Sequence, residues 1–475
     1  MKKKQLNLTS GPILRTLSEL ALPIMASSFL STAYNITDMA WIGMLGSKAV
    51  AGVGVGGMYV WLSQGLSSLA RMGGQVNMAH SLGRGDQKAA AGFAQAALQL
   101  TILFSLFVTL ISILFTNPLL QFFALNDAET YNSARIYMRI TCGLILFSFL
   151  SQVLTGLFTA QGDSKTPLKA NFFGLILNMI LDPLLVLGVG PFPRLEVVGA
   201  AVATVTAQII VLLILVTEIL RDHGEANVLH KIRLLSRPDI ACLKGVFRIG
   251  TPTALQGSLY CIISMILTRM VSGFGDGAIA VQRVGGQIES LSWNTADGFG
   301  SALNAFMGQN YGAGKKDRIK SGYHISIRLL ICWAALITIA FVFFPRQISV
   351  LFFHEEEVIR LSVDYLRIIG FSEIFLSVEM MTVGALSGLG RTQLCSLISV
   401  GLTVIRIPLA LVLSNTALGL NGIWWALTLS TVSKGIIFYF VFQYICEHSL
   451  LRTTIDKKRS DRWYFHTCSV GFFYN

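Results

Sequence analysis

Long apolar stretches separated by short polar segments recur along the whole chain. About 20 apolar residues in a helix are enough to cross a hydrocarbon core roughly 30 Å thick. The pattern predicts twelve membrane-spanning helices, at residues 14–43, 49–78, 90–116, 131–160, 165–188, 197–219, 246–272, 277–309, 321–344, 361–388, 393–414 and 419–446. The expected fold is an all-α integral membrane protein.

The composition supports this class. Hydrophobic residues make up 53% of the 475 residues and charged residues only 13%, whereas soluble domains carry about 25% charge. The first residues, MKKKQLNLTSGPILRTL, lack a compact apolar core followed by a cleavage site, so we expect a cytoplasmic tail rather than a signal peptide.

Basic residues gather in alternate loops, such as the one with Lys165 and Lys169, whereas Asp127, Glu196 and Glu355 lie in the loops between them. By the positive-inside rule, the basic loops and both termini are cytoplasmic, in a multi-pass protein of the cell (plasma) membrane. The net charge of +12 then faces one leaflet, so we expect membrane lipids and no nucleic acid as partners.

The two halves of the sequence repeat one another. Pro23 in ELALPIM and Pro252 in RIGTPTA lie 229 residues apart, as do Gly83 in HSLGRGD and Gly312 in QNYGAGK. With six spans in each half, the halves are parallel repeats, an arrangement typical of transporters. The expected organisation is an N-terminal six-helix lobe at 1–222, a cytoplasmic linker at 223–240, a C-terminal six-helix lobe at 241–446 and a cytoplasmic tail at 447–475.

Prolines recur at matching places inside these spans, at Pro23, Pro183, Pro252 and Pro408. A proline cannot donate a backbone hydrogen bond, so it frees a carbonyl one turn earlier in the helix. Two interpretations remain open: hinges for a cavity that opens and closes, or curvature that serves packing alone.

Two carboxylates interrupt the spans of the first half and are not repeated in the second. These are Asp38 in YNITDMAWIG and Asp182 in NMILDPLLV, and their counterparts are Leu267 and Ile407. A charge at the centre of a membrane helix costs about 2.5 to 3.5 kcal/mol, and such residues usually face a cavity. Counting 1.5 Å per residue places both roughly 8–10 Å below the outer ends of their helices.

Polar side chains are expected at the same depth: Thr204 on the following span, and Asn178 and Tyr34 one turn from Asp182 and Asp38. This cluster could load a proton, because burial and a neighbouring carboxylate favour the protonated acid, or it could replace the hydration shell of Na⁺. The alternative is a structural hydrogen-bonded pair. No metal is expected beyond transient Na⁺ at Asp38 and Asp182.

The second half offers polar groups of another kind. Arg283 could pair with a first-half carboxylate or with Glu289. The candidate cavity lining consists of Gln256, Tyr260, Gln282, Arg283, Gln287 and Glu289.

The motifs ALP, GMLG, TAQGD, NMILDP, GAAVAT and GQNYGAGKKDRI together resemble the multidrug and toxic compound extrusion (MATE) family over residues 12 to 446. The resemblance implies two six-helix lobes and export of organic cations or amphipathic drugs in exchange for H⁺ or Na⁺. It also implies a cation site at Asp38, Asn178, Asp182 and Thr204, with Tyr34 beside them. Another branch of the family uses acids of the second lobe, but here no acid lies between Pro252 and Arg269, where that branch carries a glutamate.

Alternatives remain at this stage. A flippase for a lipid-linked saccharide or related lipid would need a strongly cationic cavity. A membrane enzyme would need a metal cluster or a nucleophile with its base, but the seven histidines show no metal-ligand spacing and the cysteines no C-x-x-C pair. We therefore expect no enzyme and no cofactor, but a monomer that moves small, cationic or amphipathic molecules.

Overall fold

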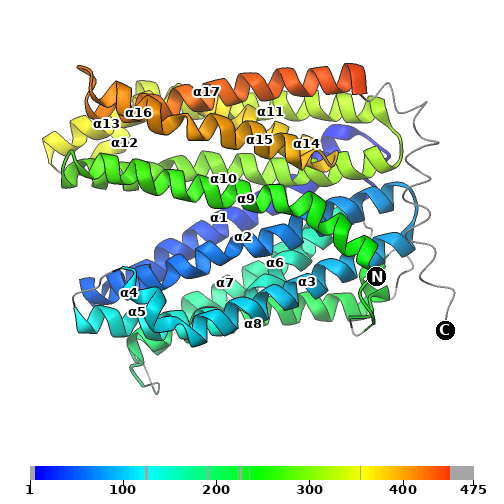
Figure 1. The fold of residues 1–475 in the computed structure, drawn as a ribbon, viewed down its shortest axis with the longest axis horizontal. Helices are drawn as coiled ribbons and strands as arrows, with labels where there is room; N and C mark the ends of the chain where they lie inside the picture. Colours follow the sequence, from blue (N-terminus) through cyan, green and yellow to red (C-terminus); the bar gives the residue numbers. More distant parts are fainter. Residues whose placement is uncertain are drawn as a thin grey trace. The chain divides into compact units, whose positions relative to one another are not determined.

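A computed structural model of the chain describes residues 6–449 except 124–126, 190, 192, 223, 225, 226, 235 and 354. The regular structure in these ranges is entirely helical (Figure 1). The all-α membrane fold is therefore confirmed. Most of the expected tail, residues 450–475, lies outside the described residues.

The first half of the chain forms eight helices. They are α1 (Ile13–Gly43), α2 (Ser47–Gly83), α3 (Gln87–Leu114), α4 (Thr116–Gln121), α5 (Ala128–Gly143), α6 (Ile145–Ala160), α7 (Lys165–Val186) and α8 (Glu196–Arg221). A short 3₁₀ turn, η1 (Val228–Lys231), lies within the linker.

The second half repeats this order, except that a pair of helices, α15 and α16, stands in place of one helix. Its helices are α9 (Ile240–Ser272), α10 (Asp276–Gly312), α11 (Lys316–Phe343), α12 (Pro345–Val350), α13 (Glu356–Gly370), α14 (Glu373–Gly388), α15 (Thr392–Val404), α16 (Arg406–Ser414) and α17 (Leu420–Tyr444). A π-helical turn, η2 (Ile445–Ser449), ends the described residues.

Within the described residues, eight spans are long and apolar enough to cross a membrane. Two further spans are bent pairs, α5 with α6 at 49° and α13 with α14 at 48°. The remaining two of the twelve predicted spans are α2 and α10, which have 37 residues each but more polar positions. Their matching places in the two halves agree with the repeat.

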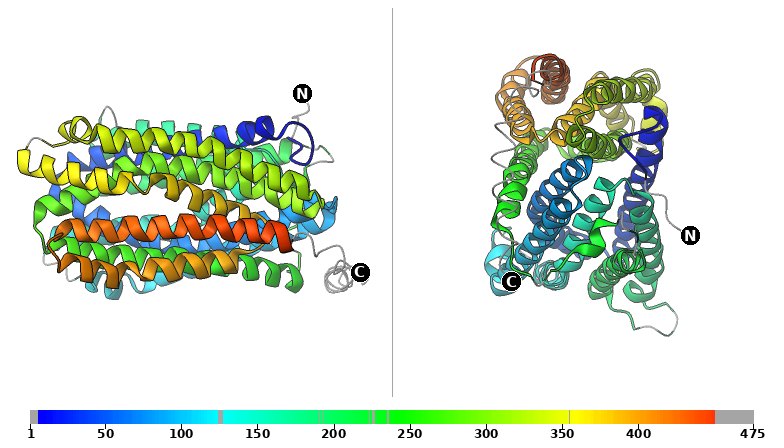
Figure 2. Two further views of the ribbon diagram at one scale, coloured as in Figure 1. Left: turned by 90° about the horizontal axis from the view of Figure 1, so that it is seen from above. Right: turned by 90° about the vertical axis from the view of Figure 1, so that its right-hand side faces the viewer.

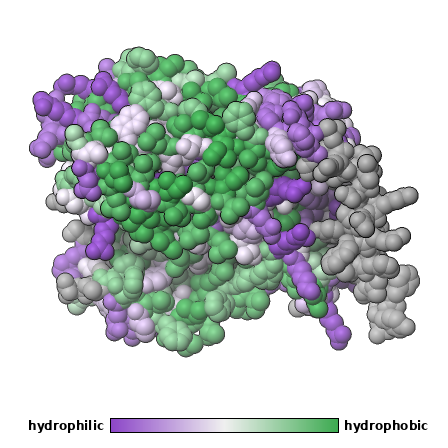
Figure 3. Space-filling view, turned by 45° about the horizontal axis from the view of Figure 1, so that its top comes forward, coloured by the Kyte–Doolittle hydropathy of each residue, from purple (hydrophilic) through white to green (hydrophobic). Residues whose placement is uncertain are grey.

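Apolar side chains cover the outer faces of the helices. On α3, Leu103, Leu106 and Leu110 are each more than half exposed, one turn apart. Figure 3 shows such side chains gathered between hydrophilic regions near the helix ends. A face of this kind is stable in contact with lipid tails, because exposing a leucine side chain to lipid carries no free-energy penalty.

The chain forms two compact units. In the described residues, unit 1 comprises residues 6–7 and 22–254, and unit 2 comprises residues 8–21 and 255–449. Helix α1 therefore changes unit after Ala21 and α9 changes unit after Ala254. Pro23 and Pro252 lie two residues from these changes.

Within unit 1, small residues let helices pack closely. A Cβ atom at Gly52 would lie 2.6 Å from Cβ of Ser133, and one at Gly56 would lie 3.0 Å from the carbonyl oxygen of Ala134. Glycines four residues apart on α2, in the segment GVGVGG, thus let α5 approach. Helix α7 packs against α8 in the same unit, and in Figure 2 these helices run alongside one another.

Candidate functional site

Three helices of unit 1 bring the five predicted cluster residues together. Helix α1 carries Tyr34 and Asp38, α7 carries Asn178 and Asp182, and α8 carries Thr204. Asp38 is 8% exposed, whereas Asn178 and Asp182 are fully buried. The one-turn spacing on α1 and on α7 places both residues of each helix on one face.

Hydrogen bonds connect the three helices at this point. The hydroxyl oxygens of Tyr34 and Thr204 are 3.1 Å apart and share a hydrogen bond. With its amide oriented to satisfy both ends, Asn178 donates through Nδ2 to Asp182 Oδ2 at 2.9 Å. Its Oδ1 accepts from the backbone N–H of Thr204 at 3.1 Å, so Asn178 fixes α7 to α8.

The carboxyl groups of Asp38 and Asp182 lie close to each other. A hydrogen bond between two carboxyl groups requires a proton on one of them, because ionised carboxylates only accept. Within the described residues, Asp38 Oδ1 has no hydrogen-bonding partner. The pair can hold one shared proton, and a free oxygen remains for another ligand.

Tyr137 on α5 also belongs to this cluster, and the sequence analysis missed it. It is 9% exposed, and its side chain lies near Thr204 and both aspartates. A Cβ atom at Gly56 would lie 3.2 Å from Cδ1 of the Tyr137 ring. The glycines of α2 signal close packing in the sequence, but nothing there identifies which side chain of α5 this packing presents to the aspartates.

The six polar residues predicted for a cavity wall belong to unit 2. Gln282 donates to the Thr268 hydroxyl at 3.3 Å, and Glu289 accepts from the Tyr365 hydroxyl at 3.4 Å. Glu289 thus bonds to Tyr365, not to the neighbouring Arg283. The side chains of Tyr260, Arg283 and Gln287 are exposed, and Gln256 is half-buried.

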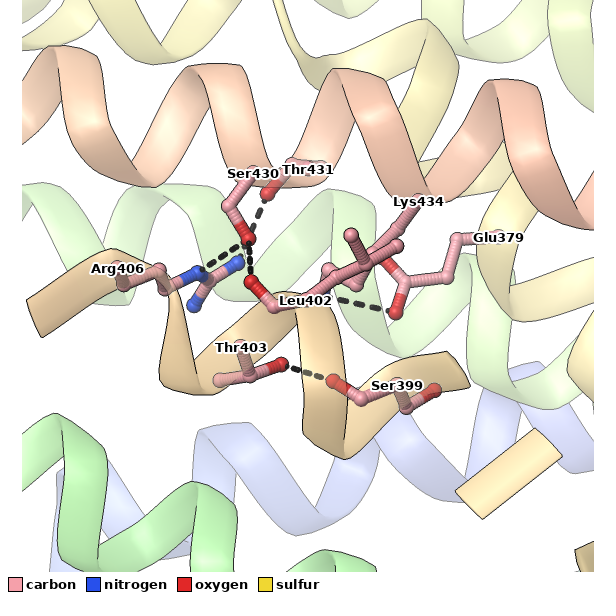
Figure 4. A network of polar contacts seen from close by, with 8 residues as sticks. All are labelled: Glu379, Ser399, Leu402, Thr403, Arg406, Ser430, Thr431 and Lys434. Carbon is pink, nitrogen blue, oxygen red and sulfur yellow. Dashed lines mark hydrogen bonds and ion pairs between the residues drawn. The ribbon is translucent and has the colours of Figure 1, made fainter. Parts of the chain in front are cut away.

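Unit 2 also holds a buried network of charged groups (Figure 4). Lys434 on α17 donates to Glu379 on α14 at 2.8 Å, and the two side chains are only 5% and 10% exposed. Arg406, at the break between α15 and α16, donates to the hydroxyls of Ser430 at 3.1 Å and Thr431 at 2.9 Å. Its guanidinium carbon also lies 5.9 Å from the centre of the Tyr260 ring.

A further carboxyl group of unit 2 is buried without a partner. Glu373 is 0% exposed, and neither of its carboxyl oxygens has a hydrogen-bonding partner among the described residues.

The described part of the chain contains no group of three or more His, Cys, Asp or Glu side chains that could hold a metal ion.

The four predicted hinge prolines occupy different kinds of position. Helices α1, α7 and α9 run through Pro23, Pro183 and Pro252 without ending. Pro408 instead follows a break, because α15 ends at Val404 and α16 begins at Arg406. The repeat pair Pro23 and Pro252 therefore has the same local structure in both halves, whereas the pair Pro183 and Pro408 does not.

Comparison with known proteins supports the resemblance found in the sequence. The family model MatE matches this chain twice, at residues 23–184 and 252–412. The two matches start 229 residues apart, which is the offset of the internal repeat.

Two curated relatives span most of the chain. The probable multidrug resistance protein NorM of Thermotoga maritima is 28% identical over 87% of this chain and 88% of its own length. The FAD transporter of Shewanella oneidensis is 26% identical over 96% of this chain and 99% of its own length.

The fold also matches a solved structure, an outward-facing multidrug resistance MATE family transporter of the MOP superfamily. The TM-score is 0.87 at 22% identity, over 95% of this chain and all of the other. At that identity the match shows the fold alone.

Proposed function

Because the chain belongs to the MatE family, and is a multi-pass membrane transporter and not an enzyme, we propose that it is a secondary antiporter. It exports organic cations or amphipathic drugs in exchange for H⁺ or Na⁺ by alternating access. The observation that carries this proposal is the buried carboxyl pair of Asp38 and Asp182 in unit 1. No cofactor is required, because the ion gradient supplies the free energy.

The proposed mechanism is a competition at the carboxyl pair. When H⁺ or Na⁺ occupies Asp38 and Asp182, their negative charge is neutralised and attraction for a cationic substrate is lost. Tyr34, Asn178 and Thr204 hold the pair in place through the bonds between α1, α7 and α8. The ion thereby releases the substrate outward before the transporter returns.

The prolines are proposed as hinges of this transition. Pro23 and Pro252 lie next to the points where α1 and α9 change unit, and a missing backbone hydrogen bond makes a helix easier to bend there.

The positive-inside pattern supports a plasma-membrane protein with the basic loops and both termini in the cytoplasm. We further propose that it works as a monomer among anionic lipids. We also propose that six polar side chains of unit 2 face the substrate: Gln256, Tyr260, Gln282, Arg283, Gln287 and Glu289.

A second candidate substrate is a flavin dinucleotide. The Shewanella relative is an FAD transporter, and Arg406 offers a buried guanidinium that pairs with no carboxylate among the described residues. Glu289 acts on Arg406 electrostatically without a direct ion pair. Arginine is well suited to a pyrophosphate. Neither curated relative is named as a lipid flippase, so that alternative gains no support.

The test is transport in proteoliposomes with a fluorescent organic cation, under a pH gradient alone and then a sodium gradient alone. Asp38→Asn should abolish transport driven by the coupled ion, whereas Glu357→Gln, an exposed acid outside the cluster, should transport normally. Full coupled transport by Asp38→Asn would contradict the proposal. Ion-driven movement of FAD, lost in Arg406→Met, would assign the second substrate.

A further inference from the structure

The turn between α10 and α11 holds the segment that precedes α1. This turn lies in the motif GQNYGAGKKDRI, for which the proposed function gives no role. Arg318 donates through Nη1 to the carbonyl oxygen of Gly11 at 2.6 Å, and through Nη2 to those of Leu8 and Ser10 at 3.2 Å each. One guanidinium thus contacts three backbone carbonyls of residues 8–11.

Lys315 in this turn and Asn310 near the end of α10 complete the contact. Lys315 donates to the carbonyl oxygen of Thr9 at 2.7 Å, and Asn310 donates to that of Leu8 at 3.0 Å. All four consecutive carbonyls of Leu8–Gly11 therefore accept hydrogen bonds from the turn and the adjoining helix ends. The Leu8 side chain is fully buried. We call this segment, Leu8–Gly11, the anchor.

Both the guanidinium of Arg318 and the backbone of the anchor have a defined geometry. Arg318 also donates through Nε to Asn310 Oδ1 at 3.2 Å and lies 5.5 Å from the centre of the Phe306 ring, which together fix the plane of its guanidinium. Gly11 has φ +78°, a conformation that favours glycine, although nothing lies within 4 Å of where its Cβ would be.

The anchor leads directly into the helix that carries part of the carboxylate cluster. Helix α1 begins at Ile13, and its residues up to Ala21 belong to unit 2 together with the anchor. From Leu22 the same helix belongs to unit 1, where it carries Tyr34 and Asp38. A continuous helix transmits displacement along its axis because its backbone hydrogen bonds resist stretching.

Helix α9, the other helix that changes unit, is preceded by a comparable attachment in unit 1. In the linker before it, Lys231 donates to Gln87 at 2.7 Å, and Gln99 donates to the carbonyl oxygens of Leu234 at 3.0 Å and Ser236 at 2.9 Å. Helix α9 carries no carboxylate after it enters unit 2. Of these two helices, only α1 connects a hydrogen-bonded attachment, the anchor, to the carboxylate cluster.

We propose that Arg318 is a positioning residue for transport, which fixes the anchor so that rearrangement of α1 at the carboxylate cluster is transmitted to the helices of unit 2. This rests on the proposed function for its transport readout. When the anchor is released, the start of α1 moves independently, and ion binding at Asp38 and Asp182 no longer drives the transition.

The test compares the native protein with Arg318→Gln and Gly11→Ala. The first removes the donor, and the second disturbs the anchor without touching the turn. Lys320→Gln is the matched control, since Lys320 is an exposed cation on the same helix. Hydrogen exchange is measured at residues 8–21 and along α10 and α11, in acidic and alkaline buffer and with and without sodium. Transport turnover and binding of the fluorescent cation are measured in parallel.

Both variants should exchange residues 8–21 about tenfold faster. In both variants, the change in hydrogen exchange caused by pH or sodium should remain in unit 1 but disappear from α10 and α11. Turnover should fall about tenfold with binding unchanged. Exchange and turnover equal to Lys320→Gln would overturn the proposal, as would faster exchange with normal turnover. If Arg318→Gln does not fold, Gly11→Ala decides alone. If the native protein transports no probe, the proposed function fails, and the exchange response in unit 2 still decides the anchor's role.

Discussion

The side chain of Asn178 binds two helices at once, with its Nδ2 2.9 Å from Asp182 Oδ2 on α7 and its Oδ1 3.1 Å from the backbone nitrogen of Thr204 on α8. One fully buried amide therefore orients the carboxyl group of Asp182 and sets the position of α8 beside it. The carboxyl pair is held by its neighbours and not by helix geometry alone.

Replacing Asn178 by alanine should destabilise unit 1. The change leaves an oxygen of Asp182 without its buried donor, which costs roughly 1–3 kcal/mol, and removes the bond from the side chain on α7 to the backbone of α8. The measurement is the thermal midpoint in detergent. Asn117→Ala, at an exposed amide, is the control and should change the midpoint little. Equal midpoints for the two variants would show that Asn178 does not fix α7 to α8.

Tyr137→Phe should weaken ion coupling without disturbing the fold. The change removes the hydroxyl that lies near Thr204 and keeps the ring that packs against Gly56. Loss of one interaction between neutral hydroxyl groups, about 0.5–1.5 kcal/mol, corresponds to roughly a two- to tenfold rise in the ion concentration for half-maximal transport. Ion-titrated transport in proteoliposomes measures this, with Tyr59→Phe, a tyrosine outside the cluster, as the control. An unchanged ion dependence would exclude Tyr137 from the site.

Lys434→Met should be among the most damaging single changes in unit 2. It leaves Glu379 as a buried charge without its partner, which costs about 3–5 kcal/mol. The double variant Lys434→Met with Glu379→Gln should recover much of the loss, because no buried charge remains. Thermal unfolding of the native protein, both single variants and the double variant completes the cycle. If the two losses simply add, the ion pair has no energetic coupling.

Asp127, outside the spans, gives a pH-dependent contribution to stability. It caps α5 by accepting from the backbone N–H of Thr130 at 2.9 Å and lies 3.0 Å from Lys48 Nζ. These contacts lower its pKa from 3.8 to about 2. A carboxyl group whose folded-state pKa is lowered stabilises the fold above its unfolded pKa, and this is lost as pH falls towards the folded value.

The native protein should therefore be more stable than Asp127→Ala at neutral pH. The difference should shrink below about pH 4, the unfolded pKa of an aspartate, and level off near pH 2. Thermal midpoints of the two proteins across this pH range test whether the stability difference shrinks on acidification. A difference that grows on acidification would contradict it.

The membrane fold, the repeat and the grouping of Tyr34, Asn178 and Thr204 around Asp38 and Asp182 could all be predicted from the amino-acid sequence. Hydrophobic runs of membrane length and the constant rise of a helix are local properties, so the depths of Tyr34, Asn178 and Thr204 followed from counting residues. The grouping of these side chains agrees with that count, whereas their role in ion coupling stays a prediction.

The side-chain contacts between helices, by contrast, could be identified only from the folded structure. The contacts of Tyr137 with Thr204, of Lys434 with Glu379 and of Arg318 with the anchor join segments far apart in the chain. Such contacts depend on how each helix is rotated and how closely it approaches its neighbour. Hydrophobic periodicity sets neither quantity in a membrane, where lipid-facing and buried positions are both apolar. For the same reason the change of unit along α1 had no signal in the sequence beyond Pro23 itself.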